Sequence, residues 1–147
     1  MIGSILVVCV GNICRSPVGE RLLAARLPHV TVASAGLGAL VGYPADKLAN
    51  DVAAERGLSL AGHAARQFTP ELAAGYDLIL VMEPKHKAEI VRTAPHLSGK
   101  TMLFDQWSGA RGIDDPYRRS RDTHGRVQDE IAKAVDGWVQ RLSRTST

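Results

Sequence analysis

The chain begins with a short apolar run that leads through a loop containing two cysteines into a helix-like stretch. Ile5–Val8 is apolar and largely β-branched, as in a buried strand, and Val18–Leu27 reads as a helix. Between them stands Cys9-Val10-Gly11-Asn12-Ile13-Cys14-Arg15-Ser16-Pro17, in which the proline suits a first helical turn. A loop in this position converges its backbone N–H groups at a helix N-terminus, where the dipole favours negative charge. We therefore predict an anion cradle at the end of a first strand.

The side chains of this loop supply the groups that phosphoryl transfer needs. Arg15 presents a permanently charged planar fork that matches two oxygens of a phosphate. Cys9, on the floor of the cradle, lies in the same positive field, which favours the nucleophilic thiolate. A bare Cys-x5-Arg spacing equally fits a buried structural cysteine with a surface arginine, but the surrounding strand, glycine, serine and proline favour the cradle. The loop thus indicates a cysteinyl-phosphate mechanism.

The other loop residues are expected to bind or support the anion. Ser16 can donate a hydrogen bond to the thiolate, and Asn12 can hold the loop through its side chain with a left-handed backbone. The phosphate- and substrate-binding residues expected from the loop are Val10, Gly11, Asn12, Ile13, Cys14 and Ser16.

Strand and helix patterns alternate along the rest of the chain, which predicts an α/β domain over residues 1–147 with a four-stranded parallel sheet flanked by helices. The expected strands are Ile5–Cys9, Val30–Ala33, Leu78–Met82 and Lys100–Phe104. The expected helices are Pro17–Leu27, Asp46–Arg56 with Gly57 as its stop, a short one from Thr69, Pro84–Arg92, and Arg121–Ser143 with Trp138 in the core. Ligands of such sheets bind beyond the carboxyl ends of strands, where Cys9 stands.

Charge and composition narrow the class of partner. The net charge of +3 and the pI of about 9.1 suit an anionic substrate, but the basic residues are too dispersed for nucleic-acid binding. No stretch has the length of a membrane span and the N-terminus lacks a signal sequence, so we expect a cytoplasmic protein without membrane insertion. A disulfide between Cys9 and Cys14 would staple nothing distant, and no zinc-ligand spacing is present. We expect no metal and no organic cofactor.

A candidate general acid follows the fourth expected strand, at the same sheet edge as the cradle. Gly112-Ile113-Asp114-Asp115-Pro116-Tyr117 contains two aspartates, and by chemistry alone either could protonate a leaving group. Pro116 restricts Asp115 to extended backbone, which would help to aim its carboxyl group. Taken alone, the segment also fits a polar turn.

Four segments of the chain resemble the low-molecular-weight protein tyrosine phosphatases, in the order and at about the spacing of that family. They are Cys9–Pro17, Ser34 within Val32–Gly36, Gly62–Gln67 with its His-x-Ala-Arg pattern, and Asp115-Pro116-Tyr117. The resemblance implies phosphotyrosine hydrolysis without a cofactor, with Asp115 as general acid and then base and Tyr117 as a wall that stacks on the aromatic ring. It also implies that Ser34 and His63 hold the loop together with Asn12, and that Arg66 braces the acid loop.

The stretch Ser34–Gly42 is more closely similar to bacterial members that act with tyrosine autokinases of capsule and exopolysaccharide export. This similarity implies a membrane tyrosine autokinase as the substrate. In the family a second loop cysteine, here Cys14, can trap the oxidised nucleophile as a disulfide; a packing role is the alternative. Eukaryotic members often have a second aromatic residue where Arg118 stands. The basic cluster of Arg118, Arg119 and Arg121 either is solvated or favours acidic peptides.

Other functions of the same loop stay open. Protein arginine phosphatases resemble the chain but typically have threonine at the position of Ile13, whose apolar side chain suits an aryl ring. Thioredoxin-coupled arsenate reductases need two further cysteines, and none follows Cys14. A phosphopeptide-binding module would need neither Cys9 nor Asp115. We expect the remaining histidines to lie on the surface: His29, His86, His96 and His124.

Overall fold

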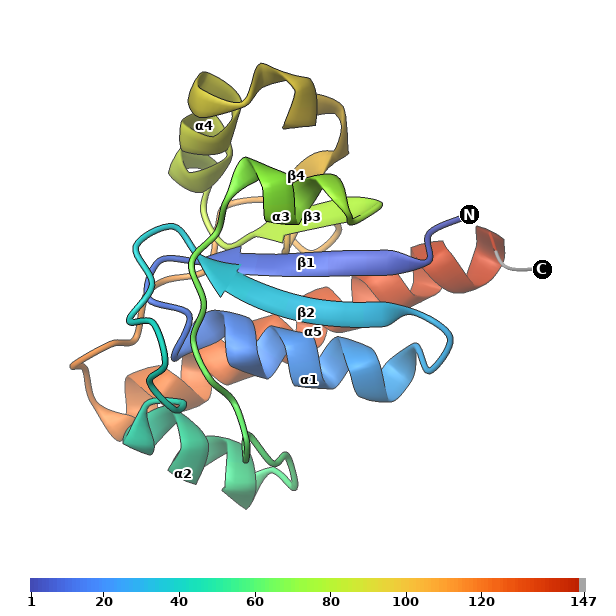
Figure 1. The fold of residues 1–147 in the computed structure, drawn as a ribbon. Helices are drawn as coiled ribbons and strands as arrows, with labels where there is room; N and C mark the ends of the chain where they lie inside the picture. The colour runs from blue at the N-terminus through green and yellow to red at the C-terminus, as the bar shows by residue number, and fades with distance from the viewer. Residues whose placement is uncertain (146–147) are drawn as a thin grey trace.

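Four parallel strands in the order β2-β1-β3-β4 form the centre of the molecule (Figure 1). They are β1 (Ser4–Cys9), β2 (Thr31–Gly36), β3 (Leu78–Val81) and β4 (Thr101–Leu103). The computed structural model describes residues 1–145. The predicted α/β fold with a four-stranded parallel sheet is confirmed.

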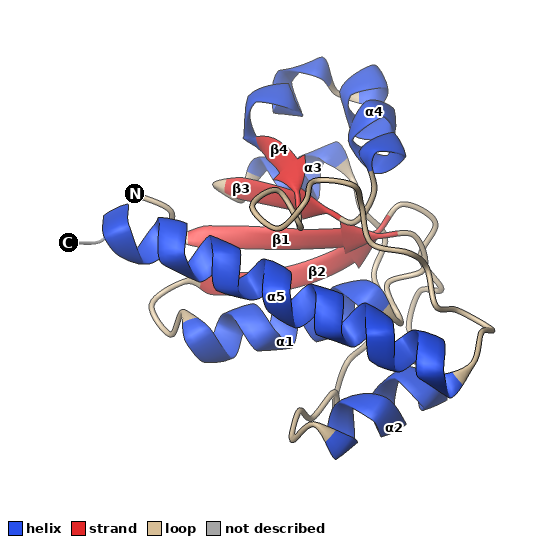
Figure 2. Cartoon of the chain, turned by 180° about the vertical axis from the view of Figure 1, so that it is seen from behind, coloured by secondary structure: helices blue, strands red, loops and turns tan. Residues whose placement is uncertain are grey.

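Helices cover both faces of the sheet, because each inner strand is apolar on both sides (Figures 1 and 2). Along β1, Ile5 and Val7 face one core and Leu6 and Val8 face the other, as the two-residue period of a strand requires. The helices are α1 (Arg15–Arg26), α2 (Lys47–Glu55) and α5 (Arg121–Thr145) on one side, and α3 (Pro70–Ala74), α4 (Pro84–Thr93) and the 3₁₀ helix η1 (Pro95–Lys100) on the other.

Several boundaries differ from the sequence-based expectation. The second strand continues past Ala33 to Gly36, because Ser34, Ala35 and Gly36 pair with Val7, Val8 and Cys9 despite their low strand propensity. The fourth strand is shorter than expected because η1 takes up Lys100, and α1 begins at Arg15 rather than at Pro17. Trp138 is buried as predicted, and its indole N–H donates to the carbonyl of Phe104 at 2.8 Å. Because the second strand extends to Gly36, its end lies against the cysteine loop.

Gly36 is required where the second strand meets that loop. A Cβ atom at this position would lie 2.2 Å from the carbonyl oxygen of Val10. We expect Gly36→Ala to lower the free energy of unfolding by about 2 kcal/mol or more, since the contact is to backbone and cannot be relieved by a side-chain rotation. Gly38→Ala, whose Cβ would meet only a Val10 methyl at 3.8 Å, is the matched control for urea unfolding. Equal stability of the two variants would contradict the predicted clash.

Candidate active site

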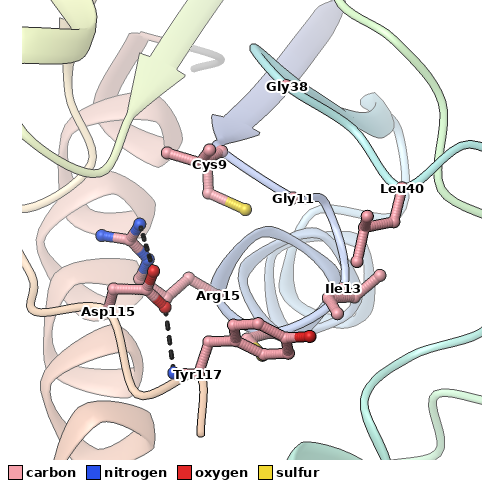
Figure 3. Close-up of a pocket in the computed structure, with 10 residues that line it drawn as sticks. Cys9, Gly11, Ile13, Arg15, Gly38, Leu40, Asp115 and Tyr117 are labelled. Atoms are coloured by element: carbon pink, nitrogen blue, oxygen red, sulfur yellow. Dashed lines mark hydrogen bonds and ion pairs between the residues drawn. The ribbon is translucent and has the colours of Figure 1, made fainter.

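The loop after β1 and the segment before α5 enclose a cavity of about 180 Å³ (Figure 3). Cys9 lies at the carboxyl end of β1, with its sulfur pointing into the cavity. Asp115 and Tyr117 lie on one side of it, and Ile13 and Leu40 lie on another. The residues that line the cavity are Cys9, Val10, Gly11, Ile13, Cys14, Arg15, Gly38, Leu40, Asp115 and Tyr117. All except Gly38 and Leu40 are among the predicted site residues.

The nucleophile candidate has a hydroxyl partner. The sulfur of Cys9 is 2.9 Å from Oγ of Ser16, in the first turn of α1. The side-chain amide of Asn12 donates to the same hydroxyl oxygen at 2.7 Å. Because Asn12 occupies one lone pair of Ser16, the hydroxyl proton is free to point at the sulfur and stabilise a thiolate.

Asn12 organises the loop from within. Its backbone is left-handed, with φ of 59°, as predicted. The side chain donates to Oγ of Ser34 at 3.0 Å, and Nε2 of His63 lies 2.5 Å from the Asn12 carbonyl oxygen. The structure therefore brings together the expected supporting residues. The structure adds Glu20 to this group, because its carboxylate accepts a hydrogen bond from the Ser34 hydroxyl at 2.6 Å. Glu20 lies four residues after Ser16 on α1, and this spacing could have indicated that it faces the loop.

Arg66 does not occupy the place expected from the family resemblance. Its guanidinium donates to the Ser34 carbonyl and to the Tyr76 hydroxyl, each at 3.0 Å. Its backbone N–H donates to Oδ1 of Asn12, also at 3.0 Å. Arg66 thus supports the second strand and the cysteine loop, and the expectation that it braces the Asp115 loop is wrong for this structure.

Arg15 is fixed by hydrogen bonds from one of its terminal nitrogens, and other N–H groups of its guanidinium remain available to an anion. Only 1% of it is exposed, and its Nη1 donates to Glu83 and to the Ile113 carbonyl, each at 2.7 Å. Its Nε is buried without a hydrogen-bond partner among residues 1–145. Buried N–H groups are rarely unpaired, so this donor is available to an anion that enters the cavity.

Glu83 is a functional residue that the sequence analysis missed. It follows β3 by two positions and therefore lies at the carboxyl edge of the sheet, the signal that could have identified it. Burial raises the pKa of Glu83, but the hydrogen bond and charge of Arg15 outweigh this and hold it below its usual range. The carboxylate is thus ionised at neutral pH and orients the guanidinium.

The acid candidate lies beside the arginine. Oδ2 of Asp115 is 3.9 Å from Nη2 of Arg15, and Oδ1 accepts a 3.0 Å hydrogen bond from the backbone N–H of Tyr117 (Figure 3). Asp115 is half-exposed while the following Pro116 is buried, so the proline anchors the turn and the carboxyl group stays accessible. Asp114 instead forms a surface ion pair with Arg126 at 3.3 Å. This geometry favours Asp115 over Asp114 as the acid.

Cys14 is a buried thiol. Burial raises the pKa of the Cys14 thiol far above its usual range, and the Asp46 carboxylate acts in the same direction. Both cysteines are free thiols. Cys14 is therefore a neutral thiol rather than a second nucleophile.

Two arginines of the basic cluster contact neighbouring side chains. Arg118 lies over the Tyr117 ring, with its guanidinium carbon 5.2 Å from the ring centroid, and Arg121 pairs with Glu55 of α2.

Two histidines expected on the surface are buried. His86 and His124 are 2% and 1% exposed, whereas His29 and His96 are exposed as predicted. His86 lies in the first turn of α4, where its Nδ1 accepts from the backbone N–H of Glu83 at 3.2 Å. Each buried histidine lies three or four residues before an apolar core residue of its helix, Ile90 or Val127, a signal that the helical period could have provided.

The buried histidine of α4 makes the stability of the protein depend on pH. Burial lowers the pKa of His86 to about 4, and the charge of Arg15 acts in the same direction. In the unfolded chain the pKa is about 6.5, so between these values the unfolded state binds the proton more tightly. We expect the free energy of unfolding to fall by at most about 3 kcal/mol as the pH drops from about 6.5 to about 4.

Urea unfolding at several pH values measures this dependence. His86→Asn retains an acceptor for the Glu83 N–H but does not titrate, so it should flatten the pH dependence. His96→Asn, at an exposed histidine, should leave the dependence unchanged. If the free energy of unfolding of His86→Asn depends on pH as steeply as that of the wild type, another group is responsible.

The described residues provide no metal cluster and no membrane span. Within residues 1–145, no group of three or more histidine, cysteine or acidic side chains is arranged to hold a metal ion. No helix in the same range combines the length and apolarity needed to cross a membrane.

Comparisons with known proteins agree with this geometry. Residues 4–147 match the family model described as low molecular weight phosphotyrosine protein phosphatase. The chain is 56% identical over 141 residues to the low molecular weight protein-tyrosine-phosphatase Etp of Escherichia coli strain K12, with 96% of this chain and 95% of Etp covered. It is 47% identical to Wzb of Vibrio vulnificus, solved in complex with benzylphosphonate, with a TM-score of 0.93 and coverage of 96% and 99%. It is 34% identical to the YwlE arginine phosphatase of Geobacillus stearothermophilus, with a TM-score of 0.90 and coverage of 97% and 94%.

Proposed function

The chain belongs to the low molecular weight phosphotyrosine protein phosphatase family and is a protein-tyrosine phosphatase, and from this premise we propose that it works through a cysteinyl-phosphate on Cys9. The observation that carries the proposal is the convergence of three groups on one cavity: the Cys9 sulfur, the guanidinium of Arg15 and the Asp115 carboxyl. A nucleophile, a fixed cation and an acid are together the set that phosphate monoester hydrolysis requires.

In the first half-reaction, the phosphate of the substrate occupies the cradle. The Arg15 fork and the loop N–H groups bind its nonbridging oxygens, with Glu83 holding the fork in place. The Cys9 thiolate attacks phosphorus, the bond from phosphorus to the tyrosyl oxygen breaks, and Asp115 donates its proton to the departing oxygen. The Ser16 hydroxyl stabilises the thiolate by a hydrogen bond before the attack.

In the second half-reaction, water resolves the intermediate. The Asp115 carboxylate removes a proton from water as the water oxygen attacks phosphorus, and the S–P bond breaks. Inorganic phosphate leaves, the Cys9 thiolate is restored and Asp115 is protonated again. The charge on phosphate is met by Arg15 and the loop amides, so these steps use no metal ion.

The apolar walls favour an aryl phosphate as the substrate. Ile13 and Leu40 line the cavity, together with the aromatic ring of Tyr117. The Vibrio vulnificus relative is described in complex with benzylphosphonate, which joins an aromatic ring to a phosphate-like group. Phosphoarginine is the second candidate, since one relative is an arginine phosphatase. Its polar guanidinium would have to lie against the apolar side chain of Ile13.

Hydrolysis of matched peptides distinguishes these substrates. One peptide sequence carrying phosphotyrosine, phosphoserine or phosphoarginine is offered to the wild type and to Ile13→Thr. We expect turnover of phosphotyrosine by the wild type, with a gain of phosphoarginine activity relative to phosphotyrosine in Ile13→Thr. Preference of the wild type for phosphoarginine would overturn the proposed substrate, and tight binding without turnover of any peptide would indicate a binding module.

The physiological substrate that we propose is a membrane tyrosine autokinase of capsule or exopolysaccharide export, dephosphorylated in the cytoplasm. The similarity of Ser34–Gly42 to bacterial members that act with such kinases supports this partner. Arg118, which lies over the ring of the cavity residue Tyr117, and the adjacent Arg119 would attract acidic or multiply phosphorylated segments. The direct test is loss of phosphotyrosine from a purified autokinase; an autokinase that stays phosphorylated while a peptide is hydrolysed would exclude it.

A further inference from the structure

A tight turn over residues 40–43, beside the cavity, holds apolar side chains out in solvent. The carbonyl of Leu40 accepts a 2.9 Å hydrogen bond from the backbone N–H of Tyr43, which closes the turn, and Gly42 within it has φ of 85°. Val41, the other central residue, is 65% exposed, and Tyr43 is 59% exposed. Because turn positions usually hold small or polar residues, the turn itself does not account for an exposed valine.

Backbone hydrogen bonds fix the 40–43 turn in place. The N–H of Leu40 donates to the carbonyl of Gly11, in the phosphate loop, at 3.1 Å. On the other side, the N–H of Gly42 donates to the carbonyl of Ala65 at 2.8 Å, and the carbonyl of Tyr43 accepts from the N–H of Ala65 at 2.9 Å. The apolar side chains thus stand on a rigid backbone, so little conformational entropy is lost when they bind another surface.

The exposed apolar side chains of this turn continue those that line the cavity. Among residues 1–145, five of the large apolar side chains that are exposed belong to the cavity or to the 40–43 turn: Val10, Leu40, Val41, Tyr43 and Tyr117. Exposed apolar residues that are scattered singly need no explanation, whereas a continuous group marks a binding surface. The apolar surface therefore extends outward from the place where the substrate binds.

The two sides of the cavity mouth differ in charge. No charged residue occurs in residues 36–45, so the side formed by Leu40 offers apolar contact without ionic attraction. The side formed by Tyr117 carries the guanidinium of Arg118 over its ring. An acidic neighbour of a bound phosphotyrosine is thus attracted to Arg118, and an apolar neighbour fits the 40–43 turn.

We propose that the 40–43 turn is a docking surface for an apolar side chain that stands next to the phosphotyrosine of a substrate protein. The proposal rests on the proposed function, in which phosphotyrosine fills the cavity. With the phosphate bound at Cys9, the residues on either side of the phosphotyrosine cross the mouth beside the turn. Contact removes apolar surface of Val41, Tyr43 and the substrate from water. The protein thus prefers phosphotyrosine sites that have an apolar neighbour.

Three peptides that differ only beside the phosphotyrosine test this preference. Two leucines precede the phosphotyrosine in the first peptide and follow it in the second, and serines stand at all four positions in the third. We expect the wild type to hydrolyse the better leucine peptide with a kcat/KM about fivefold or more above that of the serine peptide. Phenyl phosphate, which has no neighbouring residues, reports the chemistry alone.

The double variant Val41→Ser/Tyr43→Ser removes the apolar side chains and keeps the turn, whose hydrogen bonds are made by backbone groups. We expect the advantage of the leucine peptide to fall below about twofold, and kcat/KM for phenyl phosphate to change by less than about twofold. Ala61→Ser is the matched control. Ala61 is exposed and precedes Gly62, with φ of 80°, in a second tight turn that does not line the cavity, so the preference should persist.

The outcomes separate this proposal from the proposed function. Absence of a leucine preference in the wild type, or a preference that survives in the double variant, would overturn the docking surface while phosphotyrosine hydrolysis stands. An equal loss on phenyl phosphate would overturn it too, since the turn would then shape the cavity. A wild-type dimer in sedimentation that the double variant dissociates would assign the surface to a second copy of the chain instead. If the wild type hydrolyses none of the peptides, the proposed function fails, and the docking surface fails with it.

Discussion

Replacing Cys9 by serine is expected to reduce kcat for a phosphotyrosine peptide by about 10⁴-fold or more while phosphate binding persists. A serine hydroxyl does not ionise near neutral pH and is a poorer leaving group from phosphorus. The Arg15 fork and its partner Glu83 do not depend on the sulfur, so the cradle should still bind an oxyanion. Initial rates and titration with inorganic phosphate measure the two effects separately.

The other cysteine of the loop provides the control for this variant. The Cys14 thiol is kept neutral by burial. Cys14→Ala should therefore lower kcat by less than about tenfold, mainly through repacking of the loop. Comparable losses at Cys9 and Cys14 would indicate that the loop shape, rather than a nucleophilic sulfur, limits the reaction.

Asp115→Asn is expected to lower kcat/KM for phenyl phosphate by about 10²- to 10³-fold, since the amide N–H is not acidic enough to transfer a proton to the departing oxygen. The loss should be smaller for p-nitrophenyl phosphate. The amide retains an acceptor for the Tyr117 N–H, so the turn should keep its shape. Rates across a series of aryl phosphates give the dependence on leaving-group acidity, which should steepen in the variant.

The neighbouring aspartate provides a control of identical chemistry. Asp114 pairs with Arg126 on the surface and does not line the cavity. Asp114→Asn should change kcat/KM by less than about twofold, because exposed ion pairs contribute little. If Asp114→Asn shows the larger, leaving-group-dependent loss, the acid has been assigned to the wrong residue.

The parts of the fold and site that the sequence predicted depend on local pattern. The alternation of strand and helix segments indicated the parallel sheet. The anion cradle could be predicted because it lies within nine consecutive residues, Cys9–Pro17. The placement of Asp115 and Tyr117 followed from a general property of these sheets, namely that segments after the strands meet at one edge. Such features need no knowledge of which side chains touch.

The parts that were missed depend on contacts between distant segments. Glu83 holds Arg15 from 68 positions further along the chain. The position of Arg66 was taken from resemblance, whereas its contacts with Ser34 and Tyr76 depend on how this chain packs. The second strand reaches Gly36 because pairing with β1 outweighs the low strand propensity of its small residues. Tertiary contacts decided each of these features.

The most direct test of the cysteinyl-phosphate mechanism is to trap the phosphorylated enzyme. Asp115→Asn is mixed with p-nitrophenyl phosphate, whose leaving group needs little protonation, so that loss of the acid and base slows mainly the second step. The reaction is quenched in acid within one turnover, and the proteolytic fragments of the enzyme are weighed by mass spectrometry. The mechanism predicts one phosphoryl group per enzyme, on the fragment that contains Cys9, and its absence when Cys9 is also serine. Release of phosphate without a phosphorylated enzyme, or a phosphoryl group on any other residue, would contradict it.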